Sequence, residues 1–411
     1  MQSSYPSFNG GDVAQNDVPI IATANDAILS KLSASSMGYY DDPFLPHLCK
    51  DAVGLTSSST NTRAGGERRM RHSRGLDHRN EPPSSRSNYP PRRSGQGQPL
   101  IRRGSHARVC CIDRSISAFL SLESECHGRS KKQVVVIGAG KDTAYLRYRS
   151  GLLSAPPTKS GNSSAVEEEE GIRWYEVDHG SVIQEKRAIF ESVPEIKCVL
   201  SSSGTQSKDE LTPSVFHMIS HDLRHPMEEL FSTLIQKHSF NVEVPTLFVL
   251  ECVQMYLPET NSRDILSTIT HTCTTPFIAL YDPVLLHDSF GKVMHDHLAK
   301  AGTVSKHSAI SHNRTLLDQI QKLKQCGFDR VVGCDMMDAY DTVLTKEQRR
   351  RANSCEMLDE IEEWLLIMRH YCFIIGGKAG CCSMADMFCQ VGGHSPLGFV
   401  EGRCLNDMAN F

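Results

Sequence analysis

Two glycines and a carboxylate are spaced along this chain in a way that suits a nucleotide-type cofactor. Gly138 and Gly140 follow the apolar run 134–137, and Asp178 ends the next predicted strand, RWYEVD. Glycine lets the backbone turn sharply and approach a ligand closely, because no Cβ is in the way. A carboxylate at a strand end can accept hydrogen bonds from both hydroxyl groups of a ribose. The third glycine of a GxGxxG pattern is missing, which disfavours a dinucleotide and leaves room for a cofactor without pyrophosphate, such as S-adenosylmethionine.

The spacing between these residues strengthens the interpretation. The glycines alone fit an ordinary tight turn between a strand and a helix equally well. Gly140 and Asp178 are 38 residues apart, but the stretch 154–170 between them is a low-complexity run. Without that run roughly 20 residues remain, which is where a Rossmann-like unit places its ribose-binding carboxylate.

Other candidate binding side chains also follow apolar runs. Asp222 and Leu223 end the segment 215–223, where they could meet the amino group and the face of an adenine. Asp222 could equally cap the next helix. Glu251 follows the apolar run 244–250. The sequence therefore places Glu251 at the carboxyl end of a central strand, where ligands bind in open α/β sheets.

The elements that must position these side chains alternate between strands and helices. The predicted strands are 134–137, 173–178, 215–223, 244–250, 277–283, 331–336 and 370–375. The predicted helices include one that begins at Asn25 or Asp26, one that begins at Asp142–Thr143, and others over 102–123, 316–326 and 357–368. This alternation predicts an α/β fold with a Rossmann-like, doubly wound and mostly parallel sheet. The last two strands lack a normally placed crossover helix, so we expect an antiparallel edge strand.

Two of the predicted helices carry basic residues toward this sheet. The helix 102–123 should pack beside the first strand and hold Arg103 and Arg108 near its N-terminal end. Lys31 lies in the helix that begins at Asn25 or Asp26, and taken by itself it is best interpreted as a solvated lysine.

Composition disfavours several classes of protein. The 411 residues carry a net charge of −4, so no overall positive field draws the chain to nucleic acid or membrane. We find no signal peptide and no apolar run of about 18 residues, and we expect a cytoplasmic protein that does not bind membranes. The 15 cysteines lack paired CxxC spacing. This pattern favours free thiols over disulfides or a zinc site, so no metal is expected.

Polar stretches divide the chain into parts. We expect a disordered tail over 1–24, a helical cap segment over 25–50, a main α/β domain over 101–376 and an irregular tail over 377–411. The insertion 54–100 is rich in Ser, Pro and Arg, and it is predicted to be disordered because it cannot bury enough apolar surface. Eleven arginines against three acidic residues from Arg63 to Arg103 could contact nucleic acid or an acidic partner. We favour a tolerated surface insertion, because long loops cost little stability.

Seven segments of the chain together resemble one known family. The segments are KLSASSMGYYDDPF, RRGSHARV, IGAGKDT, YEVD, HDLR, LECVQMYL and MRHYCF, in this order. They resemble the leucine carboxyl methyltransferase family over about 25–50 and 100–375. The resemblance implies that S-adenosylmethionine is used to methylate the C-terminal leucine carboxylate of the catalytic subunit of type 2A protein phosphatases. A related branch modifies a wybutosine precursor in transfer RNA and carries a kelch-type propeller after this domain. Roughly 35 residues follow the last predicted strand, too few for a propeller, so the protein-methylating branch is favoured.

The family pattern also implies roles for individual residues. The implied cofactor contacts are Lys31, Arg108, Gly138, Gly140, Asp178, Asp222, Leu223 and Glu251. The candidates near the substrate carboxylate are Arg103, Arg108 and Tyr256. The sequence departs from the pattern at Ser105-His106, where the family has an aromatic pair, and at Lys141, where it has methionine.

The chemistry implied by the resemblance needs no general base. A carboxylate is already ionised at pH 7 and can attack a sulfonium methyl group in line. We expect a monomer whose partner is the phosphatase subunit. A carboxyl methyltransferase acting on transfer RNA or a small molecule, and a non-catalytic binding protein on the same fold, remain alternatives.

Overall fold

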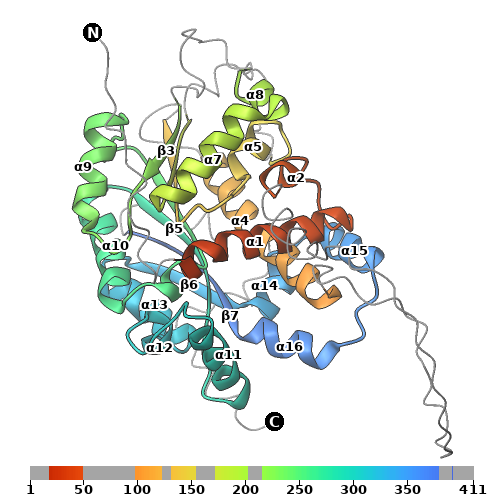
Figure 1. Cartoon of the computed structure of the whole chain (residues 1–411). Coiled ribbons are helices and arrows are strands. Elements are labelled where there is room, and N and C mark those ends of the chain that lie inside the picture. The colour runs from red at the N-terminus through yellow and green to blue at the C-terminus, as the bar shows by residue number, and fades with distance from the viewer. Residues whose placement is uncertain are drawn as a thin grey trace, which may run out of the picture.

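A seven-stranded sheet forms the centre of the molecule in the computed structural model, which describes residues 18–49, 98–122, 131–153, 172–201, 215–378 and 391 (Figure 1). The strands are β1 (Lys132–Ile137), β2 (Ile172–Asp178), β3 (Phe216–Ser220), β4 (Thr246–Glu251), β5 (Pro276–Pro283), β6 (Arg330–Asp335) and β7 (Tyr371–Gly377). Their order across the sheet is β3-β2-β1-β4-β5-β7-β6. Each strand lies within a few residues of its predicted position, because unbroken apolar runs are typical of strands buried on both faces.

All strand pairs are parallel except those of β7, which is antiparallel to both β5 and β6. The expected antiparallel edge is confirmed, because the edge strand β6 pairs antiparallel with β7. β7 lies between β5 and β6, and β6 forms the edge. Strand order depends on pairing between distant segments, which local patterns do not encode.

Helices cover both faces of the sheet (Figure 1). One face packs against α2 (Leu45–Leu48), α4 (Pro99–Ser121), α5 (Ala144–Arg149), α7 (Gly180–Ser192), α8 (Pro194–Ser201), α14 (Met336–Thr342) and α16 (Ile361–Arg369). The other face packs against α9 (Met227–Lys237), α10 (Glu259–Thr272) and α13 (Leu316–Gln325). The remaining helices are α1 (Val18–Ser36), the short 3₁₀ helix η1 (Gln254–Tyr256), α11 (Ser289–Lys300), α12 (Ala309–His312) and α15 (Lys346–Cys355).

The starts of two helices differ from the predictions. Helix α1 begins at Val18, so residues 18–24 are helical and do not belong to a disordered tail. Proline at the second position suits a helix start, because its missing amide donor is not needed there. Helix α16 begins at Ile361, after an exposed Met357.

Helix α4 contacts β4 and β5 and shares a hydrophobic core cluster with Val134 and Val136 of β1, the strand beside which it was expected to pack. It begins at Pro99, so the polar insertion ends before residue 100. The predicted low-complexity stretch 154–170, nearly all of the insertion and most of the C-terminal tail lie outside the described residues.

The described residues contain neither a membrane-spanning helix nor a cluster of side chains suited to a metal ion. None of their helices is long and apolar enough to cross a membrane. In that same part of the chain, no group of three or more His, Cys, Asp or Glu side chains could hold a metal ion. The ten cysteines that the structure describes are all free thiols.

Candidate cofactor and substrate site

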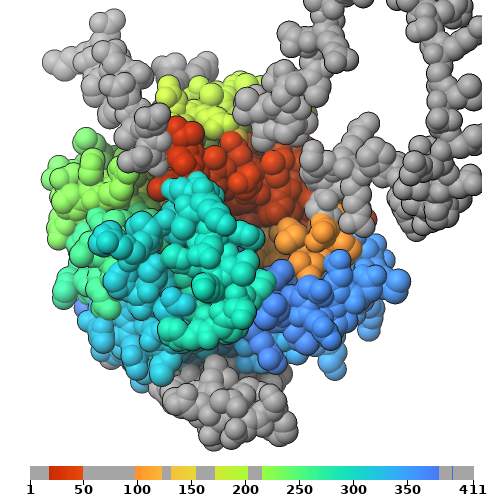
Figure 2. Space-filling model, turned by 60° about the horizontal axis from the view of Figure 1, so that its bottom comes forward, coloured from red at the N-terminus to blue at the C-terminus, as the bar shows by residue number. Residues whose placement is uncertain are grey.

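Helix α1 lies across the carboxyl ends of the central strands (Figure 1). A Cβ atom built on Gly140 would lie 3.6 Å from the Cβ of Ala24 in α1, so this helix covers the turn after β1. Figure 2 shows the cap helices in red at the surface, between yellow-green residues of α7 and α8 and teal residues of α11 and α12. The predicted cap segment thus forms one wall of the candidate site.

The glycine turn after β1 has the geometry that only glycine tolerates well. Gly138 and Gly140 adopt positive φ angles of 67° and 52°. A Cβ on Gly138 would lie 2.5 Å from Cγ2 of Val253, the residue that leads into η1. The turn therefore needs glycine both for its backbone conformation and for its close approach to the segment after β4.

Asp178 lies at the end of β2 beside this turn, as predicted. Its carboxylate accepts hydrogen bonds from the amide of Gly140 and the amide of His179, both at 2.6 Å. Burial raises the pKa of Asp178, and these two hydrogen bonds oppose the shift. The carboxylate is thus fixed next to the turn, as a ribose contact requires.

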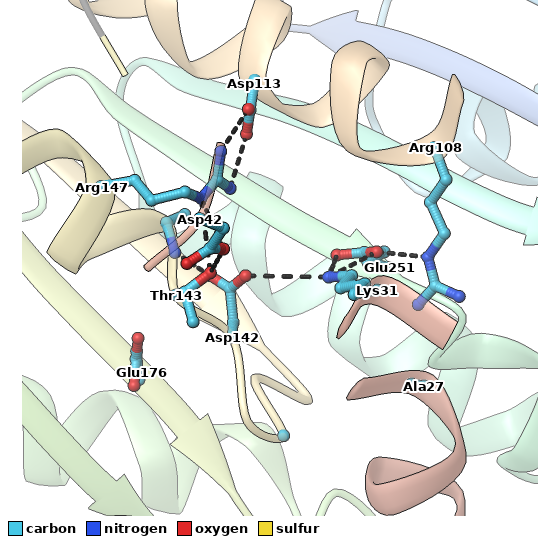
Figure 3. A network of polar contacts seen from close by, with 12 residues as sticks. Ala27, Lys31, Asp42, Arg108, Asp113, Asp142, Thr143, Arg147, Glu176 and Glu251 are labelled. Carbon is cyan, nitrogen blue, oxygen red and sulfur yellow. Dashed lines mark hydrogen bonds and ion pairs between the residues drawn. The ribbon is translucent and has the colours of Figure 1, made fainter. Parts of the chain in front are cut away.

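Glu251 is the centre of a compact ionic cluster (Figure 3). Lys31 Nζ of α1 lies 2.9 Å from Glu251 Oε1 and 3.1 Å from Oε2, and Arg108 Nε of α4 donates to Glu251 Oε1. Burial would raise the pKa of Glu251, but the charges of Arg108 and Lys31 outweigh it and hold the pKa at about 2. Three elements far apart in sequence therefore bring their charges together at the end of β4. The solvated position considered for Lys31 is wrong.

Aromatic side chains surround the other side of Arg108. Its guanidinium carbon lies 5.3 Å from the ring centroid of Tyr281, which stacks on Tyr371 at 5.4 Å. Cys252 has a positive φ of 56°, and the chain turns there from β4 into η1. Tyr256 follows in η1, and burial raises its pKa, with charges on Cys252, Tyr371 and Arg108 as smaller influences. Arg108 and Tyr256, both predicted near the substrate, thus lie in one neighbourhood.

Arg103 lies elsewhere. Its guanidinium donates to Asn353 Oδ1 at 2.8 Å and to the carbonyl oxygens of Ala352 and Glu356. Five residues separate Arg103 from Arg108, which rotates the side chain by about 140° around a helix with 3.6 residues per turn. The two arginines therefore cannot serve the same cavity, and Arg103 ties α4 to the end of α15.

Asp222 and Leu223 lie just beyond β3, next to the end of β2. The amide of His221 donates to the carbonyl oxygen of Asp178 at 2.9 Å. Asp222 binds Arg224, with Nε 2.9 Å from Oδ1 and Nη2 2.6 Å from Oδ2. Although burial acts in the opposite direction, these hydrogen bonds hold the pKa of Asp222 at about 2. Leu223 packs at the edge of the core on the α9 face.

The two departures from the family pattern lie at the margin of the site. His106 is buried between Tyr39 and Tyr40, with ring centroids 5.5 Å and 6.3 Å away. Burial lowers the pKa of His106 to about 4, so at neutral pH the residue is an uncharged aromatic ring. Lys141 binds Glu185 Oε1 of α7 at 2.5 Å. Neither substitution adds a free charge to the site.

The sequence interpretation missed the buried polar groups that support the glycine turn. Asp42, Thr143 and Arg147 contact one another, and Arg147 also binds Asp113 of α4 (Figure 3). Asp42 lies in the turn YYDDPF, directly before Pro43. An aspartate before proline in a turn is ordinary, so the sequence gives no sign that its carboxylate is buried.

Comparisons with known proteins support the family resemblance given by the sequence segments. A model described as leucine carboxyl methyltransferase matches residues 161–270. The chain is 27% identical to leucine carboxyl methyltransferase 1 of Emericella nidulans, over 92% of this chain and 88% of that protein. It is 28% identical to a leucine carboxyl methyltransferase 1 homolog of Arabidopsis thaliana, over 87% of this chain and 88% of that protein. These matches support the leucine carboxyl methyltransferase family, which the seven sequence segments resemble.

S-adenosylmethionine is the cofactor that the resemblance to this family implies. The described residues fit its charges, since Glu251 offers a buried carboxylate to an ammonium group and two cations flank it. Among solved structures, an O-methyltransferase family protein from Burkholderia thailandensis matches 68% of this chain and 60% of its own chain, with 7% identity and a TM-score of 0.32. That likeness is weak, and the strand order of the sheet is what shows the α/β fold.

Proposed function

We propose that this chain transfers a methyl group from S-adenosylmethionine to the C-terminal leucine carboxylate of the catalytic subunit of a type 2A protein phosphatase. The observation that carries the proposal is the position of Arg108. This guanidinium lies between the buried Glu251 and the ring of Tyr281. A cation held between an acid and an aromatic wall is suited to bind a second anion in a site that excludes water.

The residues around the glycine turn hold the cofactor in this proposal. Asp178 accepts hydrogen bonds from the ribose, Asp222 and Leu223 receive the adenine, and Gly138 and Gly140 let the backbone approach. Lys31, Glu251 and Arg108 bind the charged methionine end. When bound, the cofactor supplies a methyl group on a positively charged sulfur. The carboxylate of Asp222 must exchange its contact with Arg224 to meet an adenine amino group.

Arg108 orients the substrate carboxylate. It binds Glu251 through Nε, and Figure 3 shows its two terminal nitrogens directed away from Glu251. Arginine matches a carboxylate with two parallel N–H groups, which fixes the oxygen that attacks. Because that oxygen is already ionised at pH 7, the residues need only align it and exclude water. Tyr256 and Tyr371 supply the apolar walls for this purpose.

The test uses labelled S-adenosylmethionine and a phosphatase catalytic subunit with and without its terminal leucine. We expect label to enter only the protein that ends in leucine, and to leave on mild base as expected of an ester. Label in transfer RNA or in a small carboxylic acid would show that this molecule, and not the phosphatase subunit, is the substrate. Cofactor binding without transfer to any acceptor would show a binding protein.

A further inference from the structure

The turn between α1 and α2 carries two neighbouring aspartates in different surroundings. Asp42 is buried, with 6% of its surface exposed. The side chain of Asp41 is 71% exposed and pairs with Arg351 of α15 at 2.8 Å. The sequence does not distinguish these two residues, but the structure gives them separate partners. The buried one faces the cofactor turn.

Asp42 joins the cap segment to the start of α5. Its Oδ2 atom accepts a hydrogen bond from Thr143 Oγ1 at 2.6 Å and lies 3.3 Å from Arg147 Nε. Its Oδ1 atom accepts from the amide of Phe44 at 3.1 Å, which fixes the carboxylate within its own turn. Thr143 is three residues after Gly140, so this contact holds the cap against the end of the glycine turn.

Arg147 extends the connection to α4. It donates from Nη2 to Asp113 Oδ1 at 2.8 Å and from Nη1 to Asp113 Oδ2. Asp113 and the site residue Arg108 lie on the same helix. These contacts therefore fix the cap relative to α4, the helix that carries Arg108.

A second contact fixes the cap on the other side of the turn. Lys31 Nζ lies 3.8 Å from Asp142 Oδ1 as well as close to Glu251. The carbonyl oxygen of Asp142 accepts from Lys186 Nζ at 2.7 Å, and the carbonyl oxygen of Lys31 accepts from the hydroxyl of Tyr40 at 3.1 Å. The cap thus meets adjacent residues, Asp142 and Thr143, through Lys31 and Asp42 (Figure 3).

We propose that Asp42 and Arg147 are positioning residues that set the register of the cap, so that Lys31 reaches Glu251 and the methionine end of the cofactor. This inference rests on the proposed function for the identity of the cofactor. In this proposal, neither Asp42 nor Arg147 contacts the cofactor. Removing the Asp42 charge lets the cap shift against the glycine turn, and Lys31 shifts with it.

The test compares two ligands. S-adenosylmethionine has the charged methionine end, whereas 5′-methylthioadenosine lacks it and keeps the nucleoside. We expect Asp42→Asn to weaken S-adenosylmethionine binding roughly tenfold, as lost positioning of one ionic contact does, and to leave 5′-methylthioadenosine binding within twofold. Asp41→Asn, the matched control one residue away, should leave both affinities unchanged. Calorimetric titrations well below the melting temperature of each variant measure these values.

A second pair of variants guards against misfolding of Asp42→Asn. Thr143→Val removes the hydroxyl group with little change of shape and should weaken S-adenosylmethionine selectively, while Thr143→Ser should restore binding. Equal weakening of both ligands, or unchanged binding in Asp42→Asn and Thr143→Val, would overturn the inference alone. If the wild-type chain fails to bind S-adenosylmethionine, the proposed function falls and the inference falls with it.

Discussion

Arg108 differs from an ordinary surface arginine because three kinds of contact fix it: an acid through Nε, an aromatic ring and the rigid helix α4. Arg108→Lys keeps the charge but loses the planar fork. We expect it to lower kcat/KM by roughly ten- to a thousandfold, which corresponds to a few kcal/mol of lost positioning. Arg108→Ala should be worse, with a melting temperature within a few degrees of wild type. The measurement is steady-state kinetics. Normal turnover by Arg108→Ala would show that Arg108 does not belong to the site.

The pKa of Glu251 links stability to pH. Its folded-state pKa is about 2, below the ordinary value of 4.5. The stabilisation is therefore fully present above about pH 4.5 and is lost as the pH falls toward 2. For a shift of this size it amounts to about 3 kcal/mol. Urea unfolding at stepped pH should show a smaller acid-induced loss in Glu251→Gln than in wild type.

Glu347→Gln is the control for that experiment, because the side chain of Glu347 is 75% exposed. Its pH profile should follow the wild-type profile. Parallel profiles for Glu251→Gln and wild type would show that Glu251 is not the group responsible.

Asp178 permits a prediction that concerns the cofactor alone. Asp178→Ala should weaken S-adenosylmethionine binding by about 1.5–3 kcal/mol, since hydrogen bonds to a charged acceptor are lost. The variant also frees the amides of Gly140 and His179, so the fold should be checked by circular dichroism. Wild-type affinity by calorimetry would end the ribose assignment.

Individual site residues could be predicted where a strand end determines their place. Asp178 and Glu251 follow apolar runs, and parallel strands bring such positions to one edge of the sheet. Arg103 could not be separated from Arg108 by proximity in sequence, although the helical rotation between them distinguishes them. Asp42 could not be predicted, because its burial depends on α4 and α5 packing around it.

At the scale of elements, the turn between β1 and α5 limits what the chain tolerates. Gly138→Ala should destabilise the protein by about 1–3 kcal/mol, because it combines a positive φ with a 2.5 Å approach to Val253. The double variant with Val253→Ala should recover only the steric part. Gly104→Ala is the control, since a Cβ there meets nothing within 4 Å and alanine favours a helix. In urea unfolding, Gly138→Ala should be the least stable variant, the double variant should be intermediate and Gly104→Ala should be the most stable. Equal stability of Gly138→Ala and Gly104→Ala would contradict this prediction.

The strands and several helices were predictable because their signals are local. Unbroken apolar runs marked β1 and β4, and the spacing of apolar residues marked α4. The place of β7 inside the sheet was not predictable, because it depends on pairing with β5 and β6.

At the scale of the whole molecule, the stretch 54–97 lies outside the described residues and joins the cap to α4 in sequence. We predict that replacing it with a short Gly/Ser bridge leaves methyl transfer and melting temperature nearly unchanged. Its composition offers little apolar surface to bury, and shortening a long loop changes closure entropy only slightly. A large loss of either property, measured by labelled transfer and calorimetry, would show that the stretch contributes to the folded site.

The contacts of the cap segment have a consequence for the order of folding during synthesis. Lys31 can bind Glu251 only after a further 220 residues have been synthesised, and Tyr39 can bind Glu356 only after a further 317 residues. The part of this chain that leaves the ribosome first is therefore among the last to find its partners. Contacts of such long sequence separation form slowly. A nascent chain stalled before residue 251 would hold the first three strands and the glycine turn but lack the carboxylate that binds Lys31 and Arg108, so cofactor binding becomes a late signal that the chain is complete to β4.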